Sequence, residues 1–489
     1  MQAIRAGKRE RSNMVHNSNY MKCSECERHN WLVKNSPESY EQDEAHIFME
    51  NTTKEAKELA KKLFKGVQIN EIDASYETQK ALKNNCTLFD AYFENDVASC
   101  TVDILVMKNS KADIYLVKSG VNIYYFAKEL SFQKMVLKSK GINVKNMYLI
   151  LIDRDYVRGK KLNIKKLFKI TNVNNLDNSR NMYKRAAEID LTQSLPCEPY
   201  SEVKKYCQHC GFFEYCFKDL PKPNIFEISG MDFATKLNLY NRGIVSFKDF
   251  VEKNEETDKA YMKQINCTLS NKPMVNKAKL REFLGNLKYP IGFLDFETVA
   301  PLIPEFDKNK VGELIITQFS YHVIEKEGEK PKHYEFIGDG ITYPEKDLCK
   351  ALIEYIKPNH TVLMYSPYEK TCINHLISKQ PSFAKELEAI KKNLVDLEQP
   401  FRKKYLYHPL MQGRSSIKKV LPALYPHSKK LGYENLEVKN GAMAVEKYMN
   451  LKNLPKAERL EMIEKLLNYC CMDTLAMVAL VEKIKEYAR

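Results

Sequence analysis

The sequence has no long apolar run. Nowhere do apolar residues continue for the roughly 20 positions that a helix needs to cross a bilayer. The basic opening stretch MQAIRAGKRERSN is not followed by the apolar core of a secretory signal. We therefore expect a cytoplasmic protein with no membrane partner. With 44% hydrophobic and 29% charged residues, the composition is that of a folded globular chain.

Features of a disulfide-stapled protein are also missing. The 13 cysteines are an odd number in a chain of 489 residues without a secretory signal, so metal ligation or simple burial is the better interpretation. No internal repeat is evident, and the length predicts about three domains. The net charge of +14 favours an anionic partner such as nucleic acid. A general richness in Lys and Asn accounts for that charge equally well.

The first half of the chain shows the pattern of an α/β domain. Residues 1–20 form a basic arm, to which we assign no role. Residues 52–66 have helical apolar spacing and predict an amphipathic helix with Thr52 as its N-cap. Residues 86–120 alternate apolar and polar side chains, which predicts a strand meander. A helix, followed by a strand at 147–152, completes the unit.

A different pattern follows the two prolines in LPKPN. Residues 221–285 have the helix, glycine turn, helix pattern of a hairpin, which serves as a spacer or grips a phosphate backbone. Apolar runs at 289–299, 314–324 and 360–366 then predict buried strands, and helical stretches follow them. Strands followed by helices are typical of a mixed sheet flanked by helices.

Two acidic residues interrupt the first of these apolar runs, GFLDFET. Asp295 and Glu297 alternate with apolar neighbours, so on a strand both carboxylates point to one face. Buried acids are costly unless something binds them. Near the C-terminus, Tyr469 and Asp473 lie four residues apart and share one face of a helix. Hydrolysis of a phosphodiester by two Mg²⁺ or Mn²⁺ ions needs such converging carboxylates.

These two motifs resemble those of the DEDD exonuclease superfamily, in the tyrosine-bearing branch that includes the proofreading domains of DNA polymerases. Asp295 and Glu297 match the first motif of that family, and Tyr469 with Asp473 matches the third. The resemblance implies an RNase H-like fold and 3′–5′ exonuclease activity. Either motif alone could be an ordinary strand edge or helix face, but their order, separation and apolar setting favour the nuclease.

The second motif departs from the family, which places an Asp after an aromatic residue. The matching stretch MYSPYEK offers Glu369, whose longer side chain still binds a metal. Asp396 is an alternative ligand, although a turn-capping role is the simpler account of it. Lys418 and Lys419 are candidate phosphate contacts, against the alternative that they are merely solvated.

A cluster of cysteines marks the N-terminal half. Cys207, Cys210 and Cys216 fall within YCQHCGFFEYC, and three neighbouring thiols need a fourth partner to complete a metal site. Cys26 is the distant candidate. Ligand type alone does not separate a zinc ion from a [4Fe–4S] cluster.

CERHNWL, the central strands and the C-x-x-C-x-x-x-x-x-C spacing together resemble the iron–sulfur RecB-type nucleases, including CRISPR-associated members. The resemblance covers about residues 23–217. It implies a [4Fe–4S] cluster, with zinc as the alternative, on Cys26, Cys207, Cys210 and Cys216, and leaves Cys23 and His209 as bystanders.

The nuclease site of that family is incomplete in this chain. Asp103 matches its metal-binding Asp, Lys118 its Lys and Gln133 its downstream Gln. The position of the second acid holds Leu116, which cannot ligate Mg²⁺, and Asp113 lies at the wrong offset to replace it. We therefore expect a catalytically degenerate module kept for DNA binding or scaffolding, with residual nicking activity as the alternative.

The whole arrangement resembles a bacterial domain-of-unknown-function family that fuses an iron–sulfur RecB-like module to a DEDD exonuclease domain. It predicts an α/β chain with a basic arm (1–20), a RecB-like module (21–220), a helical linker (221–285) and an exonuclease domain (286–489). We expect a 3′–5′ exonuclease acting on nucleic acid, with DNA favoured, in repair or defence. The alternative is a catalytically weak DNA-binding or scaffold subunit.

Overall fold

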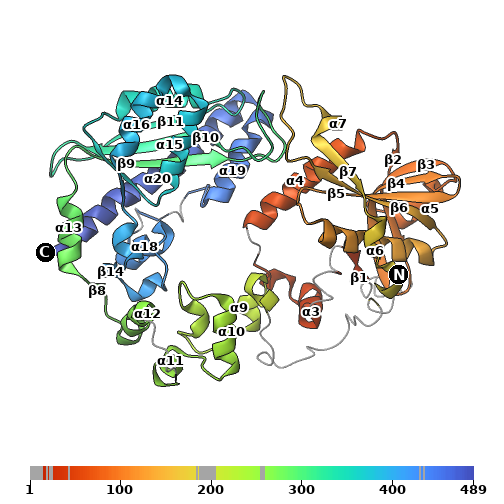
Figure 1. Ribbon diagram of the computed structural model, residues 1–489, viewed down its shortest axis with the longest axis horizontal. Coiled ribbons are helices and arrows are strands. Elements are labelled where there is room, and N and C mark those ends of the chain that lie inside the picture. Colours follow the sequence, from red (N-terminus) through yellow and green to blue (C-terminus); the bar gives the residue numbers. More distant parts are fainter. Residues whose placement is uncertain are drawn as a thin grey trace. The chain divides into compact units, whose positions relative to one another are not determined.

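The computed structural model shown in Figure 1 describes most of the chain. The described residues are 15–17, 20, 26–41, 44–182, 186, 205–253, 259–428, 431–432 and 436–489. Most of the predicted basic arm, and Cys23, lie outside them. The chain divides into two compact units. Unit 1 contains residues 1–218 and 301–313, and unit 2 contains residues 219–300 and 314–489.

Unit 1 is built on a seven-stranded mixed sheet. Its strands are β1 (Val15–His16), β2 (Val67–Gln68), β3 (Cys86–Glu94), β4 (Ala98–Lys108), β5 (Lys111–Lys118), β6 (Asn143–Ile152) and β7 (Phe168–Asn172). They follow the order β2-β3-β4-β5-β6-β7, and β1 pairs with β4. β3, β4 and β5 form the antiparallel meander that the alternating pattern predicts, and β6 is the predicted strand at 147–152.

Helices cover both faces of this sheet. The described α-helices of unit 1 are α3 (Glu27–Asn35), α4 (Glu44–Lys61), α5 (Ala74–Ala81), α6 (Ile123–Ser139), α7 (Ile164–Leu167) and α9 (Phe213–Cys216). The apolar side of α6 packs in one core, and Ala56 and Ala60 of α4 pack in the core on the other side. Residues 301–313 join the second core through Leu302 and Ile303, and Arg158 Nη1 donates a hydrogen bond to the carbonyl of Pro304 at 2.9 Å.

The predicted helix at 52–66 starts earlier than its sequence suggests. α4 begins at Glu44, so the prediction that Thr52 is an N-cap is wrong. Thr52 lies inside the helix, where its hydroxyl donates to the carbonyl of Phe48 at 2.9 Å. A threonine can satisfy its hydroxyl against the carbonyl four residues earlier as well as at a cap.

Unit 2 contains a five-stranded mixed sheet. Its strands are β9 (Ile291–Val299), β10 (Ile315–Ile324), β11 (Lys332–Ile337), β12 (Thr361–Met364) and β13 (Leu394–Asp396), in the order β11-β10-β9-β12-β13. β9, β10 and β11 are antiparallel, whereas β12 and β13 run parallel to β9. The three predicted buried strands are confirmed as β9, β10 and β12. A separate pair joins β8 (Met274–Val275) to β14 (Leu406–Tyr407).

Two groups of helices enclose the five-stranded sheet, as Figure 1 shows. α20 (Lys456–Ala488), α13 (Lys277–Gly285) and α18 (Ile417–Leu424) share one core with β9 and β12. α14 (Glu345–Tyr355), α15 (Tyr368–Lys379) and α16 (Ala384–Lys392) form the core on the opposite face. α17 (Gln399–Arg402) and α19 (Gly441–Asn450) complete this part of the unit.

The segment predicted as a helical linker forms helices that belong to unit 2. α10 (Phe233–Asn241), α11 (Phe247–Lys253) and α12 (Lys259–Ser270) enclose a small core of their own with Ile225 and Ile228. The predicted α/β class is confirmed at the level of mixed sheets flanked by helices. In the part of the chain that the structure describes, no helix is both long enough and apolar enough to cross a membrane.

Candidate carboxylate site

The alternation of β9 decides which face of the unit 2 sheet carries the acids. Leu294 and Phe296 are buried in the core formed with α14 and α15, whereas Phe293 belongs to the core shared with α20. Asp295 and Glu297 are in register with Phe293, so both carboxylates lie on the α20 side of the sheet. This is the arrangement that the apolar-acidic alternation predicts.

α20 brings the C-terminal motif to the same place. Tyr469 and Asp473 are only 3% and 8% exposed. Between them along the helix, the Cys470 thiol donates a hydrogen bond to Asp295 Oδ2 at 3.3 Å. Two motifs that are 175 residues apart in the sequence are therefore in direct contact.

The four predicted carboxylates form one electrostatic cluster. Burial first, and then the charges of Asp473, Glu297 and Glu369, raise the pKa of Asp295 well above its usual range. Burial, Asp473 and Glu369 raise the pKa of Glu297 to about 8, and burial, Asp396 and Asp473 raise that of Glu369 to about 8. Acids that hold their protons this strongly are close together and poorly solvated.

Glu369 and Asp396 were alternatives for the same role, and the structure separates their surroundings. Glu369 is 3% exposed, and its Oε2 is buried without a hydrogen-bond partner among the described residues. Asp396 instead forms an ion pair with Arg402 and accepts a hydrogen bond from the backbone N–H of Glu398 at 2.9 Å. Asp396 already has a cation, whereas Glu369 has an oxygen that lacks a partner.

The turn before α15 places Glu369 at the site. Ser366 has a φ of 97°, a conformation that non-glycine residues rarely adopt and that is often found at functional sites. α15 starts directly after Pro367, so Glu369 lies in its first turn, where the helix dipole favours a negative charge. A hydrogen bond of 2.7 Å between Thr298 Oγ1 and the Tyr368 hydroxyl fastens this turn to the end of β9.

A lysine lies next to the cluster. The Nζ of Lys418, in the first turn of α18, is 6.0 Å from the centre of the Tyr469 ring, and its charge opposes the rise in the pKa of Glu297. Lys419 is oriented differently, with its Nζ donating to Gln412 Oε1 at 3.2 Å. Of the two lysines predicted as phosphate contacts, Lys418 is therefore the one beside the carboxylates.

The donor set fits a hard divalent cation. One ligand atom each from Asp295, Glu297 and Cys470 lie within 4.8 Å of one another. Mg²⁺ and Mn²⁺ prefer carboxylate oxygens. A bound cation would offset the repulsion among the buried acids. It would also be a binding partner for the Glu369 oxygen that has no hydrogen bond.

Two of the predicted nuclease residues of unit 1, Asp103 and Lys118, form ion pairs with residues of the flanking helices. Lys57 Nζ on α4 lies 2.5 Å from Asp103 Oδ1, while Asp103 Oδ2 accepts a hydrogen bond from the backbone N–H of Val117 at 2.7 Å. The negative charge of Asp103 raises the pKa of Lys57, so this lysine is protonated. Lys118 forms an ion pair of 2.8 Å with Glu129 on α6.

The other residues of that predicted site have structural surroundings. Leu116 is fully buried in the core, and Gln133 donates a hydrogen bond from Nε2 to the carbonyl of Thr101 at 3.0 Å. Asp113, which lies at the wrong offset in the sequence, accepts a hydrogen bond from Asn146 Nδ2 at 2.7 Å. Asp103 and Lys118 thus bind partners of opposite charge from the two flanking helices.

The four predicted cysteine ligands lie close together. Burial first, and then Cys210, Cys26 and Cys207, raise the pKa of Cys216 to about 11 against the opposing effect of Arg28. Within the described residues, no three of these sulfurs lie within 4.8 Å of one another.

A histidine near these cysteines was not predicted. His29 on α3 is buried, and its Nδ1 is 3.7 Å from Cys210 Sγ. His209, the predicted bystander, is exposed.

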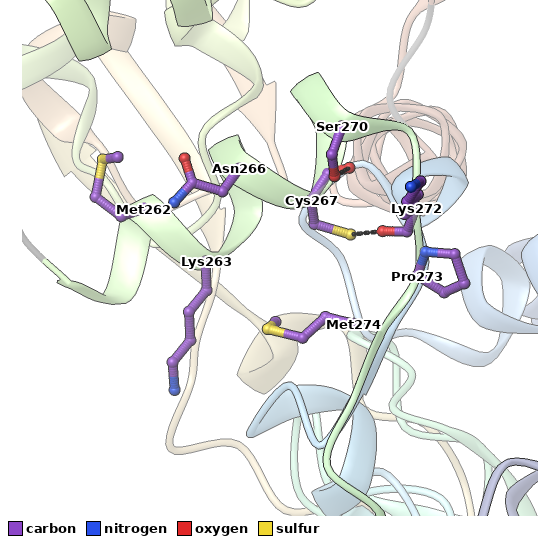
Figure 2. Close-up of a pocket in the computed structure, with 8 residues that line it drawn as sticks. All are labelled: Met262, Lys263, Asn266, Cys267, Ser270, Lys272, Pro273 and Met274. Atoms are coloured by element: carbon purple, nitrogen blue, oxygen red, sulfur yellow. Dashed lines mark hydrogen bonds between the residues drawn. The ribbon is translucent and has the colours of Figure 1, made fainter.

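Unit 2 also has an open pocket of about 470 Å³ on α12, shown in Figure 2. The residues that line it are Met262, Lys263, Asn266, Cys267, Ser270, Lys272, Pro273 and Met274. Cys267 Sγ donates a hydrogen bond to the carbonyl of Lys272 at 3.0 Å, which closes one wall. None of the predicted site residues lines this pocket, and its lining has no carboxylate.

Sequence reasoning missed two neighbours of the carboxylates. Cys470 contacts Asp295, and Thr298 bonds the tyrosine beside Glu369. Thr298 directly follows the Asp-x-Glu motif, but nothing in the sequence pairs it with Tyr368. Cys470 stands next to Tyr469 in a run of two cysteines, and only the packing of α20 decides which of them faces β9.

Comparison with known proteins gives one family match. Residues 292–416 match a family described as Domain of unknown function (DUF2779). The match contains Asp295, Glu297 and Glu369 and ends before Lys418 and the tyrosine motif of α20. No curated protein and no solved structure shows a significant match to the chain.

Proposed function

We propose that unit 2 is a metal-dependent 3′–5′ exonuclease of the RNase H-like, tyrosine-bearing DEDD type. The observation that carries the proposal is the buried cluster of Asp295, Glu297, Glu369 and Asp473 beneath α20. Four buried acids, three of which have raised pKa values, are unfavourable as a purely structural feature, because each ionised carboxylate is costly to bury. They are well suited to hold two Mg²⁺ or Mn²⁺ ions.

The strand order supports this fold assignment. An antiparallel β9-β10-β11 meander continued by the parallel strands β12 and β13 is the mixed sheet that the resemblance implies. The first acidic motif lies on the central strand β9, and the third lies on the helix that packs over it.

The residues of this site divide the work of phosphodiester hydrolysis. When bound, the two metals would make a water molecule more acidic and stabilise the leaving oxygen. Tyr469 would orient the attacking water through its hydroxyl, and Asp473, one helical turn further, would be one of the residues that hold the metals. Lys418 contributes a positive charge toward the scissile phosphate.

Aromatic and basic side chains at the rim support a nucleic-acid substrate. Tyr368 is 43% exposed, and its pKa is raised by burial of the hydroxyl and by the nearby Glu297 and Glu369. An exposed aromatic ring beside the site offers a surface on which a terminal base can stack. We favour DNA as the substrate, in repair or defence.

We propose that unit 1 is a catalytically degenerate RecB-like module. Lys57 places its ammonium group against Asp103, where a divalent cation would bind in an active site. Together with Leu116 at the position of the second acid, the Lys57 ammonium group supports the loss of catalysis in unit 1. The role that we propose for the module is therefore DNA binding or scaffolding.

We propose that the cysteines of unit 1 bind a [4Fe–4S] cluster, with a zinc ion as the alternative. Either group would use all four thiolates. The combined effect of Cys210, Cys26 and Cys207 on the pKa of Cys216 supports a shared site.

The deciding experiment uses the anaerobically purified full chain and 5′-labelled single-stranded DNA and RNA with Mg²⁺ or Mn²⁺. We expect a ladder that shortens from the 3′ end, and no cleavage of a circular strand. Asp295→Ala should abolish cleavage and leave binding of the strand intact.

The matched control is Asp347→Ala, which removes an exposed acid on α14 that is paired only with a neighbouring lysine. It should cleave like the wild type. If wild type and Asp295→Ala cleave equally, the site is wrongly assigned. If the wild type binds DNA without cutting it, the chain acts as a binding or scaffold subunit.

A further inference from the structure

A second group of potential metal ligands lies where α20 packs on β10 and β11. His322 on β10 and His333 on β11 are direct cross-strand partners, and Cys471 on α20 lies close to both. One ligand atom from each of the three lies within 4.8 Å of the other two. His322 is buried, whereas His333 and Cys471 are half-buried.

The positions of these atoms match those of a compact metal site. Cys471 Sγ is 3.8 Å from His333 Nδ1, and the two imidazole rings have centroids 4.4 Å apart. In a tetrahedral zinc site with Zn–N near 2.0 Å and Zn–S near 2.3 Å, neighbouring ligand atoms are about 3.3–3.8 Å apart. The two rings stack at 24° to each other, so they have to turn toward one another before both imidazole nitrogens point at one ion.

Hydroxyl groups hold both rings in place. The Nδ1 of His322 forms a hydrogen bond of 2.8 Å with Thr474 Oγ1, and the Nε2 of His333 forms one of 2.9 Å with Ser320 Oγ. Ser320 and Thr474 are themselves joined by a hydrogen bond of 2.7 Å. A metal-binding histidine usually has its second nitrogen fixed in this way, which orients the first toward the metal.

We propose that His322, His333 and Cys471 bind one zinc ion that fastens α20 to β10 and β11. His333 would bind through Nδ1, which faces Cys471, and His322 through Nε2. Two imidazoles and a thiolate are a ligand set that zinc accepts, whereas Mg²⁺ prefers oxygen. Two of the three ligands are half-exposed, so the fourth coordination position of the zinc ion would be taken by water.

The protonation of these groups is compatible with such a site. Burial lowers the pKa of His322 to about 4 and also lowers that of His333, so both imidazoles are neutral near pH 7. Zinc would have to displace the proton of the Cys471 thiol, and a bound metal ion does this readily.

This zinc site is separate from the carboxylate cluster, although the two share a helix. Cys470 faces Asp295 on β9, and its neighbour Cys471 faces His333 on β11. The inference does not depend on nuclease activity. What the zinc ion would do is fix the register of α20, and thereby the helix that carries Tyr469 and Asp473.

The test is the zinc content of the anaerobically purified full chain after incubation with ZnCl₂ and dialysis against 5 mM MgCl₂, measured by mass spectrometry of the metals. We expect the wild type to retain one zinc ion per chain more than Cys471→Ser or His333→Gln. This difference holds whether the cysteines of unit 1 carry iron or zinc. Cobalt titration gives a second readout, with the loss of a one-thiolate charge-transfer band in Cys471→Ser.

The matched control is Cys349→Ser, which alters a buried cysteine on α14 that belongs to neither ligand group. It should retain the same zinc as the wild type. Should one variant fail to fold, the other still decides the question. Equal zinc in the wild type and the folded variants, or displacement of the extra zinc by magnesium, would overturn the proposal and leave a hydrogen-bonded histidine pair.

Discussion

The Cys470 thiol donates a hydrogen bond to Asp295 Oδ2 across 3.3 Å. A thiol is a weak donor, so it does little to stabilise the charged carboxylate, and the pKa of Asp295 stays well above its usual range. The contact therefore positions Asp295 against α20, but it does not stabilise the ionised carboxylate enough to offset the effect of burial. We propose a divalent cation as the partner of this carboxylate.

The roles of Glu369 and Asp396 can be distinguished by replacing each carboxylate in turn with its amide. Glu369→Gln should lower cleavage by more than about 100-fold, because losing a metal ligand costs at least as much as losing a group that supports one. Asp396→Asn should lower it by less than about 10-fold, since Arg402 already binds that carboxylate. Single-turnover rates at saturating Mg²⁺ measure both. The reverse order of effects would make Asp396 the ligand.

Removing the Tyr469 hydroxyl should affect the reaction and leave the metals in place. Tyr469→Phe keeps the ring beside Lys418, and we expect a loss of about 10- to 100-fold in kcat with unchanged DNA binding. Mg²⁺ titrations of the cleavage rate check this prediction. A variant whose rate recovers at high Mg²⁺ would show that Tyr469 supports metal binding instead.

The raised pKa values predict how stability depends on pH. In the unfolded chain Glu297 and Glu369 ionise near 4.5, whereas in the folded, metal-free protein their pKa values are about 8. The folded state keeps its protons to higher pH, so these groups lower the free energy of unfolding as pH rises from about 4.5 to about 8. Above pH 8 their destabilising effect is complete.

Magnesium should reverse this effect, because it binds the ionised carboxylates. The rise in Tm on adding Mg²⁺ should therefore be larger at pH 8 than at pH 6, and calorimetry in two buffers should detect proton release on binding. In Glu297→Gln both signals should shrink. A magnesium effect that does not change with pH would argue against binding at these carboxylates.

The Lys57–Asp103 pair predicts a stability effect in unit 1. Lys57→Met leaves the carboxylate of Asp103 buried without its cation and should cost about 2 kcal/mol, less than a fully buried pair because the Lys57 side chain is 29% exposed. Adding Asp103→Asn should recover part of the loss in a double-mutant cycle. Lys111→Met, at an exposed position of β5, is the control.

The same pair predicts that nuclease activity is absent from unit 1. Asp103→Ala should leave all cleavage of DNA unchanged, in contrast to Asp295→Ala. Loss of a nicking or 5′-end activity in Asp103→Ala would show that unit 1 is an active nuclease.

The cysteine cluster predicts a colour. The protein purified without oxygen should absorb near 400 nm and carry about four irons per chain, and Cys207→Ser should lose both properties. Substitution of Cys267, which is buried in a core of unit 2, should change neither. Zinc in place of iron in the anaerobic wild type would support the alternative.

Local spacing in the sequence was enough to predict the central features of the carboxylate site. Alternation along β9 placed Asp295 and Glu297 on one face, and a spacing of four residues placed Tyr469 and Asp473 on one side of α20. Such periodicities follow from backbone geometry alone. The strands β9, β10 and β12 could be anticipated from their apolar runs.

Contacts between elements could not be predicted in this way. Nothing in the sequence pairs Lys57 with Asp103, because α4 and β4 come into contact only when the helix packs against the folded sheet. β11 is short and polar, so His333 gave no signal until pairing placed it beside His322. These relationships depend on register and packing, which single-sequence patterns do not specify.

The connection between β9 and β10 has a consequence for how this protein can be divided. Residues 301–313 leave the unit 2 sheet and supply Leu302 and Ile303 to the core of unit 1. A gene fragment starting at the linker would carry both apolar side chains away from the core that buries them, and would leave a gap there. The two halves are consequently not interchangeable modules: recombination or truncation at the linker would open the core of unit 1, so they are expected to be inherited and expressed as one piece.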